Sequence, residues 1–320
     1  MNGLYLGIDT SCYTTSIACV EEKSIVLDER TVLSVPLGGR GLRQSDGLFQ
    51  HNRNLPALLK RLYASVNPKR IAGVGVSAAP TGAEQSYMPV FLAGILTAEA
   101  IAGALSVPLV RTTHQRGHLR AAMYGGNETL LEKARFLALH VSGGTTDVLE
   151  VTAGNGLIDT VRPLGCSTDL HAGQMVDRLG VALGLPFPAG KRLEALAGDA
   201  EEKDIRLPSS VRGTSCSLSG AESQAQRLLQ GGAPAAEVAY AVYDCLARTL
   251  VKLIHNAAQE TGCDTALVSG GVASSLLLRR LVGQRNRFGL EIRYGESRLS
   301  SDNAVGVAFD AKESLCSRKP

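Results

Sequence analysis

Short apolar runs alternate with amphipathic stretches along the chain, a pattern typical of α/β proteins. Apolar runs at residues 4–9, 16–20 and 24–27 predict three strands that follow each other closely. Leucines recur at helical spacing over residues 53–66, which predicts an amphipathic helix there. The elements predicted next are a buried strand over 71–77, a buried helix over 89–105 and a buried strand over 107–110.

The pattern restarts near residue 136. Residues 9–20 align without a gap on residues 140–151, and both copies hold Ser-x-x-Thr-Thr within an apolar frame. Such self-similarity is an architectural signal, so we predict two similar α/β lobes with a cleft between them. The predicted lobes are residues 1–133 and 134–320, the second with a helical insertion at about 165–235.

Two glycine-rich turns suit phosphate binding. A predicted strand over 136–141 leads into Ser-Gly-Gly at 142–144, and an apolar run leads into Ser-Gly-Gly at 269–271 before a helix. Backbone N–H groups in such turns and at helix starts bind phosphate oxygens. Together with the small-residue turn that follows Asp9, they predict a nucleotide site in the cleft.

The composition narrows the class of protein. No apolar run reaches the roughly 18–20 residues of a membrane span, so we expect a soluble, cytoplasmic protein with no membrane partner. The seven cysteines never form a CxxC pair, which argues against a disulfide framework. A net charge of +3 is too small to indicate nucleic-acid binding by itself. A weak RNA signal comes from arginine clusters at Arg111, Arg116 and Arg120 and at Arg279, Arg280, Arg285 and Arg287.

His114 and His118 are four residues apart, so on a helix they project from one face. Two imidazoles placed in this way can bind one metal ion and leave positions for a carboxylate and for substrate oxygens. A pair of surface histidines is the alternative. Zinc peptidases also pair histidines, but they carry a general-base glutamate beside the first one. Gln115 stands there and cannot accept a proton, so a peptidase is not expected.

Several ordered segments resemble one family, the tRNA threonylcarbamoyladenosine synthases, or TsaD family, formerly called glycoproteases. The resemblance covers nearly the whole chain and implies an α/β fold of the actin-like ATPase and sugar-kinase type, with an adenine nucleotide ligand and a metal. The segments that carry it are Gly7–Cys12, His114–His118, Val141–Gly144, Ala172–Asp177, Leu183–Gly190, Cys216–Gly220, Ser269–Ala273 and Ser301–Ala304.

The resemblance also implies site residues. His114, His118 and Asp302 match the family's metal ligands, and iron or zinc suits imidazole donors. His140 is a candidate further ligand, because relatives from archaea and eukaryotes have a metal-reaching tyrosine there; a core histidine bonded to backbone is the alternative. The positions that match or flank nucleotide or adenylate contacts are His140, Val141, Ser142, Gly143, Gly144, Asp177, Gly190, Glu194, Gly270, Gly271 and Ser275.

Some positions depart from the family pattern. Asp9 stands for a glutamate, and Tyr13 stands for an aspartate that is thought to assist catalysis. We place both at the catalytic site, although a phenol is a poor base at neutral pH compared with a carboxylate. Ser275 replaces an asparagine, and Ala79–Gly82 replaces a Gly-Pro-Gly loop. The chain therefore resembles a divergent paralogue.

The predicted function is a metal-dependent transferase that moves a threonylcarbamoyl group from threonylcarbamoyl-adenylate to an adenosine of tRNA. ATP or an acyl-adenylate is the expected ligand, and other subunits of a tRNA-modification complex are candidate partners. Two alternatives remain open from the sequence. One is a weakened paralogue that acts as a nucleotide-binding scaffold or regulatory subunit, and the other is a carbamoyltransferase with a small-molecule acceptor.

Overall fold

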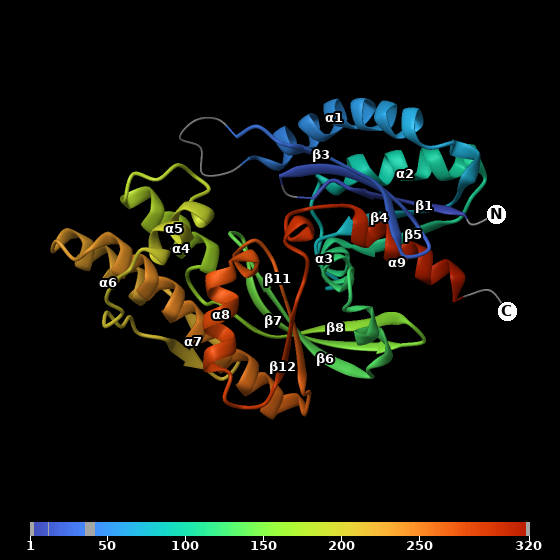
Figure 1. Ribbon diagram of the computed structural model, residues 1–320. Coiled ribbons are helices and arrows are strands. Elements are labelled where there is room, and N and C mark those ends of the chain that lie inside the picture. The colour runs from blue at the N-terminus through green and yellow to red at the C-terminus, as the bar shows by residue number, and fades with distance from the viewer. Residues whose placement is uncertain (1–2, 12, 36–41, 318–320) are drawn as a thin grey trace. The chain divides into compact units, whose positions relative to one another are not determined.

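The computed structural model describes residues 3–11, 13–35 and 42–317. Contacts within the chain divide it into two compact units. The first comprises Met1–Glu132, Ala153–Ile158 and Ser301–Pro320, and the second comprises Lys133–Thr152 and Asp159–Ser300. A five-stranded sheet runs through each unit (Figure 1).

In the first unit the strands lie in the order β3-β2-β1-β4-β5. β1, β2 and β3 are antiparallel neighbours, whereas β4 and β5 run parallel to β1. Successive strand residues face opposite sides of a sheet: Ile8 packs towards α2, and Gly7 lies against α9. The elements are β1 Leu4–Asp9, β2 Thr14–Glu21, β3 Ser24–Val32, α1 Gln44–Ser65, β4 Ile71–Ala79, α2 Phe91–Leu105, β5 Leu109–Thr113, α3 His114–Met123 and α9 Val305–Cys316.

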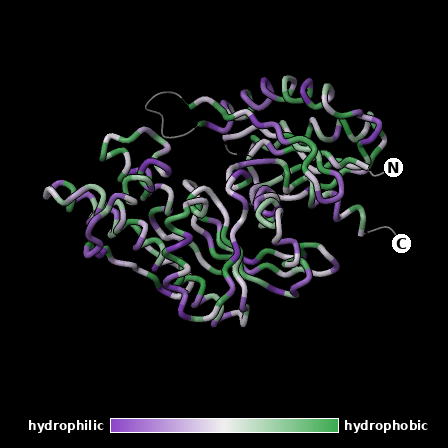
Figure 2. The backbone as a smooth tube through the Cα atoms, viewed as in Figure 1, coloured by the Kyte–Doolittle hydropathy of each residue, from purple (hydrophilic) through white to green (hydrophobic). Residues whose placement is uncertain are grey.

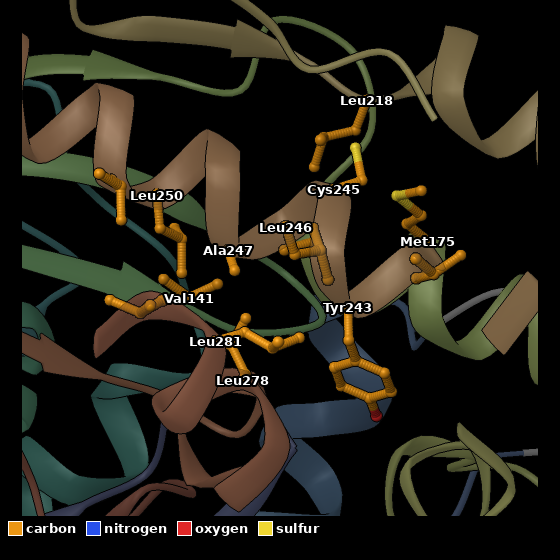
Figure 3. Close-up of a cluster of buried hydrophobic side chains, with 14 of the residues drawn as sticks. Val141, Met175, Leu218, Tyr243, Cys245, Leu246, Ala247, Leu250, Leu278 and Leu281 are labelled. Atoms are coloured by element: carbon orange, nitrogen blue, oxygen red, sulfur yellow. The ribbon is translucent and has the colours of Figure 1, made fainter. Parts of the chain in front are cut away.

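In the second unit the order is β12-β11-β6-β7-β8. Its core surrounds the long helix α7, where Leu246 and Leu250 meet Val141 of β6 and Leu278 and Leu281 of α8 (Figure 3). The elements are β6 Arg135–Val141, β7 Thr146–Gly154, β8 Leu157–Cys166, α4 Ala172–Ala182, α5 Gly190–Gly198, β9 Ser210–Arg212, β10 Ser215–Ser217, α6 Ser219–Gln230, α7 Ala235–Thr261, β11 Thr265–Ser269, α8 Leu276–Arg285 and β12 Glu291–Tyr294, with short 3-10 turns at Pro68–Arg70, Glu128–Glu132, Val272–Ser274 and Ser297–Leu299.

The repeat predicted from the sequence has the same strand register in both units. Asp9 lies opposite Ser16 in the β1–β2 pair, and the aligned residues His140 and Asp147 lie opposite each other in the β6–β7 pair. The strand order is also the same, because β6, β7, β8, β11 and β12 take the places of β1, β2, β3, β4 and β5. The two units therefore share one topology.

Two boundaries differ from the sequence prediction. The helix predicted over 53–66 begins earlier, at Gln44. The apolar periodicity did not mark its first turns, because the buried positions there are Gly47 and His51. The predicted second lobe, 134–320, follows chain order, whereas the contacts group residues from Ser301 onward with the first unit. A Cβ on Gly7 would lie 2.4 Å from the carbonyl oxygen of Ala304, so the start of α9 packs directly on β1.

Apolar positions gather along the strands of both sheets, and α1 alternates apolar with polar positions (Figure 2). The predicted insertion at about 165–235 contains α4, α5 and α6. None of the helices in the described part of the chain is long and apolar enough to cross a membrane.

Candidate metal centre and nucleotide-binding residues

The paired histidines lie on the first turns of α3. Thr113 ends β5 and caps the helix, because its hydroxyl accepts a hydrogen bond from the backbone N–H of Arg116 at 3.2 Å. The helix therefore starts at His114, and its geometry brings His118 onto the same face. The two Nε2 atoms lie 2.9 Å apart.

Asp302 joins this pair from the turn before α9. Its Oδ1 lies 3.4 Å from Nε2 of His118 and 3.7 Å from Nε2 of His114. Among the described residues, these three form the group whose donor atoms all lie within 4.8 Å of one another. Two imidazole nitrogens and one carboxylate oxygen are a donor set that suits zinc or divalent iron. The residues present thus fit a metal ion, and their side chains are 10–23% exposed, which leaves room for a further ligand.

A buried carboxylate stands behind His114. Oδ2 of Asp9 lies 2.9 Å from Nδ1 of His114 and accepts a hydrogen bond from the Ser77 hydroxyl at 2.5 Å. Oδ1 of Asp9 accepts from the backbone N–H of Ser11 at 2.8 Å and from the Ser11 hydroxyl. A carboxylate that holds the Nδ1 proton of a histidine directs the Nε2 lone pair to a metal. Asp9 is therefore placed to orient His114.

The pKa values at this cluster follow from burial and charge. Burial alone would raise the pKa of Asp9. The positive charge of His114 and the hydrogen bonds to the carboxylate outweigh burial, so the pKa of Asp9 is lowered. Burial lowers the pKa of His114, and the Asp9 carboxylate outweighs it and raises that pKa to about 9. The pKa of His118 is lowered by burial and by the charge of His114. Burial and the neighbouring charge therefore favour the neutral form of His118.

The Ser142–Gly144 turn of the second unit follows β6. The Ser142 hydroxyl accepts hydrogen bonds from the backbone N–H groups of Gly144 and Thr145 at 3.3 and 3.1 Å, and Ser142 O accepts from Gly173 N at 3.0 Å. A Cβ on Gly143 or Gly144 would meet nothing within 4 Å. Folding therefore does not require glycine at these two positions, and their open backbone suits the approach of a phosphate.

The Gly270–Gly271 turn follows β11 and has one constrained and one open glycine. Gly270 has a φ of +99°, and a Cβ there would lie 2.4 Å from the Val141 carbonyl oxygen. At Gly271 a Cβ would meet nothing within 4 Å. The backbone conformation and close packing require glycine at position 270, whereas neither requires it at position 271.

Ser275 and Glu194 hold the start of α8. The Ser275 hydroxyl accepts from Leu278 N at 3.1 Å, and Oε1 of Glu194 accepts from Leu277 N at 2.8 Å. Glu194, Gly198, Leu276, Leu277 and Arg280 line a pocket of about 290 Å³ beside this helix start. A helix N-terminus with an adjoining pocket is a suitable place for part of a nucleotide.

The other predicted nucleotide residues have structural partners in the second unit. Oδ1 of Asp177 accepts from Ala189 N at 2.8 Å, and burial raises the pKa of Asp177. The Gly190 carbonyl accepts from the Tyr243 hydroxyl at 2.9 Å. His140 is half-buried at the end of β6, with its Nδ1 3.3 Å from the Ser269 hydroxyl. A role of these residues in ligand binding stays a prediction.

The chain is similar to a known family over most of its length. The family model of TsaD, described as tRNA N6-adenosine threonylcarbamoyltransferase, matches residues 48–309. A relative of that name from Thermus thermophilus is 32% identical, over 96% of this chain and 91% of its own length. Another of that name from Methanopyrus kandleri is 29% identical, over 95% of this chain and 85% of its own length. This chain belongs to the TsaD family.

Solved structures show the fold of this TsaD-family chain. HypF from T. kodakarensis has a TM-score of 0.60 at 15% identity, over 98% of this chain and 48% of that one. Component A of (R)-2-hydroxyglutaryl-CoA dehydratase from Acidaminococcus fermentans has a TM-score of 0.59 at 16% identity, over 98% and 99%. A ROK family glucokinase from Streptomyces griseus has a TM-score of 0.53 at 12% identity, over 97% and 100%. The actin-like ATPase fold predicted from the sequence is confirmed.

Tyr13, the main departure from the TsaD pattern, is exposed in the turn between β1 and β2. Its side chain is 44% accessible, and its carbonyl accepts a hydrogen bond from Leu33 N at 2.7 Å. Cys12, which belongs to the same motif, lies outside the described residues. The exposed phenol leaves the position free to change without disturbing the core.

Sequence reasoning missed two residues near the candidate metal centre. Ser77 donates to Asp9 although 68 positions separate them. His51 of α1 is fully buried, its Nδ1 lies 2.9 Å from the Thr15 hydroxyl, and its Nε2 has no hydrogen-bond partner. Burial lowers the pKa of His51 to about 4, against the opposing charges of Asp9 and Asp302. The sequence signal that could have found His51 is its place on the buried face of the amphipathic helix α1.

Several arginines of the two clusters have partners within the fold. Arg111 pairs with Glu99, Arg116 with Asp310, Arg120 with Glu313 and Arg285 with Asp244. Arg279 donates to the carbonyl oxygens of Ala273 and Gly295. These contacts stabilise the fold, and a role of the arginines in RNA binding stays a prediction.

Proposed function

We propose that this chain is a metal-dependent transferase that moves a threonylcarbamoyl group from threonylcarbamoyl-adenylate to N6 of an adenosine in tRNA. The observation that carries the proposal is the convergence of His114, His118 and Asp302, with Asp9 behind the first histidine, in a chain that matches the TsaD family over residues 48–309. Divalent iron or zinc is the proposed ion, because imidazole and carboxylate donors suit both.

The proposed reaction is a group transfer with no redox step. N6 of the adenosine attacks the carbamoyl carbon, a C–N bond forms, and the bond from that carbon to the phosphate oxygen breaks. AMP leaves with the electron pair of the broken C–O bond, and N6 gives one proton to solvent. A bound metal would supply Lewis-acid polarisation of the ligand oxygens.

The chain's own residues divide the remaining work. His114, His118 and Asp302 of the first unit hold the ion, and Asp9 keeps the Nδ1 proton of His114 in place. In the second unit, the open glycines Gly143, Gly144 and Gly271 favour close approach of phosphate oxygens to backbone N–H groups. Further nucleotide contacts are proposed for His140, Val141, Ser142, Asp177, Gly190, Glu194, Gly270 and Ser275.

His140 is also proposed as a further metal ligand when nucleotide is bound. A His140→Gln variant should then bind zinc as the wild type does without nucleotide, and more weakly than the wild type with AMP present. Equal zinc affinity of the two proteins in both conditions would remove His140 from the ligand set and leave it only a nucleotide role.

The test is an incubation of the purified protein with zinc or iron, threonylcarbamoyl-adenylate and unmodified tRNA. Mass spectrometry of the digested tRNA should show N6-threonylcarbamoyladenosine, and product should disappear with a chelator and in a His118→Gln variant. If the protein alone gives none, the assay is repeated with the other subunits of a tRNA-modification complex. Absence of product under both conditions, with AMP still bound, would overturn the proposal.

A further inference from the structure

Helix α3, which carries the two histidines, crosses α9, which follows Asp302, at two glycines. Gly117 lies between His114 and His118 on α3, and Gly306 lies on the first turn of α9. A Cβ on Gly306 would lie 1.8 Å from the Gly117 carbonyl oxygen and 2.7 Å from Ala121 N. Both are backbone atoms and cannot rotate away. Any side chain at Gly306 would therefore force α9 away from α3.

Asp302 is rigidly tied to this end of α9. The side chain of Asn303 closes the intervening turn, since its Oδ1 accepts from Val305 N at 3.0 Å and its Nδ2 donates to Ser301 O at 2.9 Å. Asp302 therefore moves with the start of α9. His118 is one position past Gly117 on the facing helix, with its Nε2 3.4 Å from Oδ1 of Asp302.

We infer that Gly306 is a positioning residue of the metal centre, because its contact with Gly117 sets the distance at which Asp302 meets the two histidines. The inference rests on the proposed metal function. A displacement of α9 by about 1 Å would be large compared with the roughly 0.2 Å tolerance of metal–ligand bonds. The lack of a side chain at Gly306 thus allows the close helix contact that positions Asp302 for the ion.

The same two helices are also joined by ion pairs to residues farther along α9. Arg116 pairs with Asp310 at 3.1 Å, and Arg120 pairs with Glu313 through both carboxylate oxygens. Their acidic partners on α9 lie away from Gly306, so these pairs stabilise the packing of α9 without forming the glycine contact. They allow the effect of helix position to be separated from the effect of helix stability.

Other glycines supply graded controls. A Cβ on Gly117 would lie 3.0 Å from Cγ2 of Val307, a side-chain atom that would have to give by a few tenths of an ångström, and 3.8 Å from Val307 N, an ordinary contact. A Cβ on Gly103, within α2 of the same unit, would meet nothing within 4 Å. Gly306→Ala should therefore disturb the packing of α9 on α3 most and Gly117→Ala less, and Gly103→Ala should leave it unchanged.

The experiment titrates chelator-treated full-length proteins with Zn²⁺ by calorimetry at one pH, with circular dichroism to follow folding and thermal midpoints. Gly306→Ala should bind zinc about 10–100-fold more weakly than the wild type, the loss seen when residues supporting a metal ligand are changed. Gly117→Ala should show a smaller but measurable loss, below about tenfold, without a lower thermal midpoint. Gly103→Ala should match the wild type. Glu313→Gln should lower the thermal midpoint and keep wild-type zinc affinity.

Each contrary result has a distinct meaning. A wild-type protein that binds no zinc or iron overturns the metal proposal and this inference together. A wild type that binds zinc while Gly306→Ala binds it equally well overturns the inference alone. The same holds if Glu313→Gln loses as much affinity as Gly306→Ala, since helix stability would then explain both. If Gly306→Ala does not fold, a Gly117→Ala protein with unchanged affinity overturns the inference, and one with reduced affinity at an unchanged midpoint supports it.

Discussion

Nδ1 of His114 lies 2.9 Å from Oδ2 of the fully buried Asp9. This contact and the Ser11 hydroxyl, 2.7 Å from the same nitrogen, orient the ring so that Nε2 faces His118 and Asp302. An Asp9→Asn substitution keeps the shape but removes the charge that holds the Nδ1 proton. Zinc affinity should therefore fall by about 10–100-fold, measured by calorimetry against the wild type.

A Ser77→Ala protein is the matched control for Asp9→Asn, because it removes one hydrogen bond to the same carboxylate and keeps the charge. It should lose less zinc affinity than Asp9→Asn. Equal losses in the two variants would show that the hydrogen-bond network, rather than the charge of Asp9, orients His114.

The buried His51 should make the protein less stable in mild acid. Its pKa is lowered to about 4 when folded, whereas an unfolded histidine titrates near 6.5. As the pH falls from about 6.5 to 4, the unfolded chain binds a proton that the folded chain does not. The free energy of unfolding should drop across this window by up to about 3 kcal/mol.

Urea unfolding at pH 7.5 and pH 5 would measure the contribution of His51. A His51→Gln variant has no titrating group there, so its stability should fall less than that of the wild type between the two pH values. Parallel loss in the two proteins would assign the acid sensitivity to other groups. The asparagine that also bonds Thr15, Asn54, is left unchanged in both.

The strands and the repeat could be read from the sequence because they depend on local patterns. Apolar runs marked β1 and β6, and the aligned residues Asp9 and His140 do occupy matching registers. The start of α1 was missed because Gly47 and His51 occupy buried positions where the periodicity required apolar side chains.

Contacts between distant segments were beyond the sequence pattern. Nothing in the run of small residues in β4 marks Ser77 as a donor to Asp9, because the relation exists only once β1 and β4 are paired. The return of α9 to the first unit is likewise non-local. The spacing of His114 and His118 was readable, whereas Asp302 came from the family resemblance.

Tyr13 offers a direct test of the proposed chemistry. The side chain is exposed, so Tyr13→Asp should change stability by less than about 0.5 kcal/mol. A carboxylate accepts a proton at neutral pH, and transfer to tRNA should therefore be faster by about tenfold or more. The measurement is the initial rate of product formation, with Tyr13→Phe as the matched control. Rates that do not differ among the three proteins would exclude a proton-transfer role for this position.

The adjoining glycines Gly270 and Gly271 should respond in opposite ways to alanine. Gly270 has a left-handed φ of +99° and no room for a Cβ beside Val141, so Gly270→Ala should lower the free energy of unfolding by about 2 kcal/mol or more. Gly271→Ala places its methyl group in open space and should fold normally. If phosphate oxygens approach this turn, the same methyl group will keep them away. Calorimetric binding of AMP should then be weaker for Gly271→Ala at an unchanged thermal midpoint. Unchanged AMP affinity would remove this turn from the proposed nucleotide site and leave the Ser142–Gly144 turn as its phosphate contact.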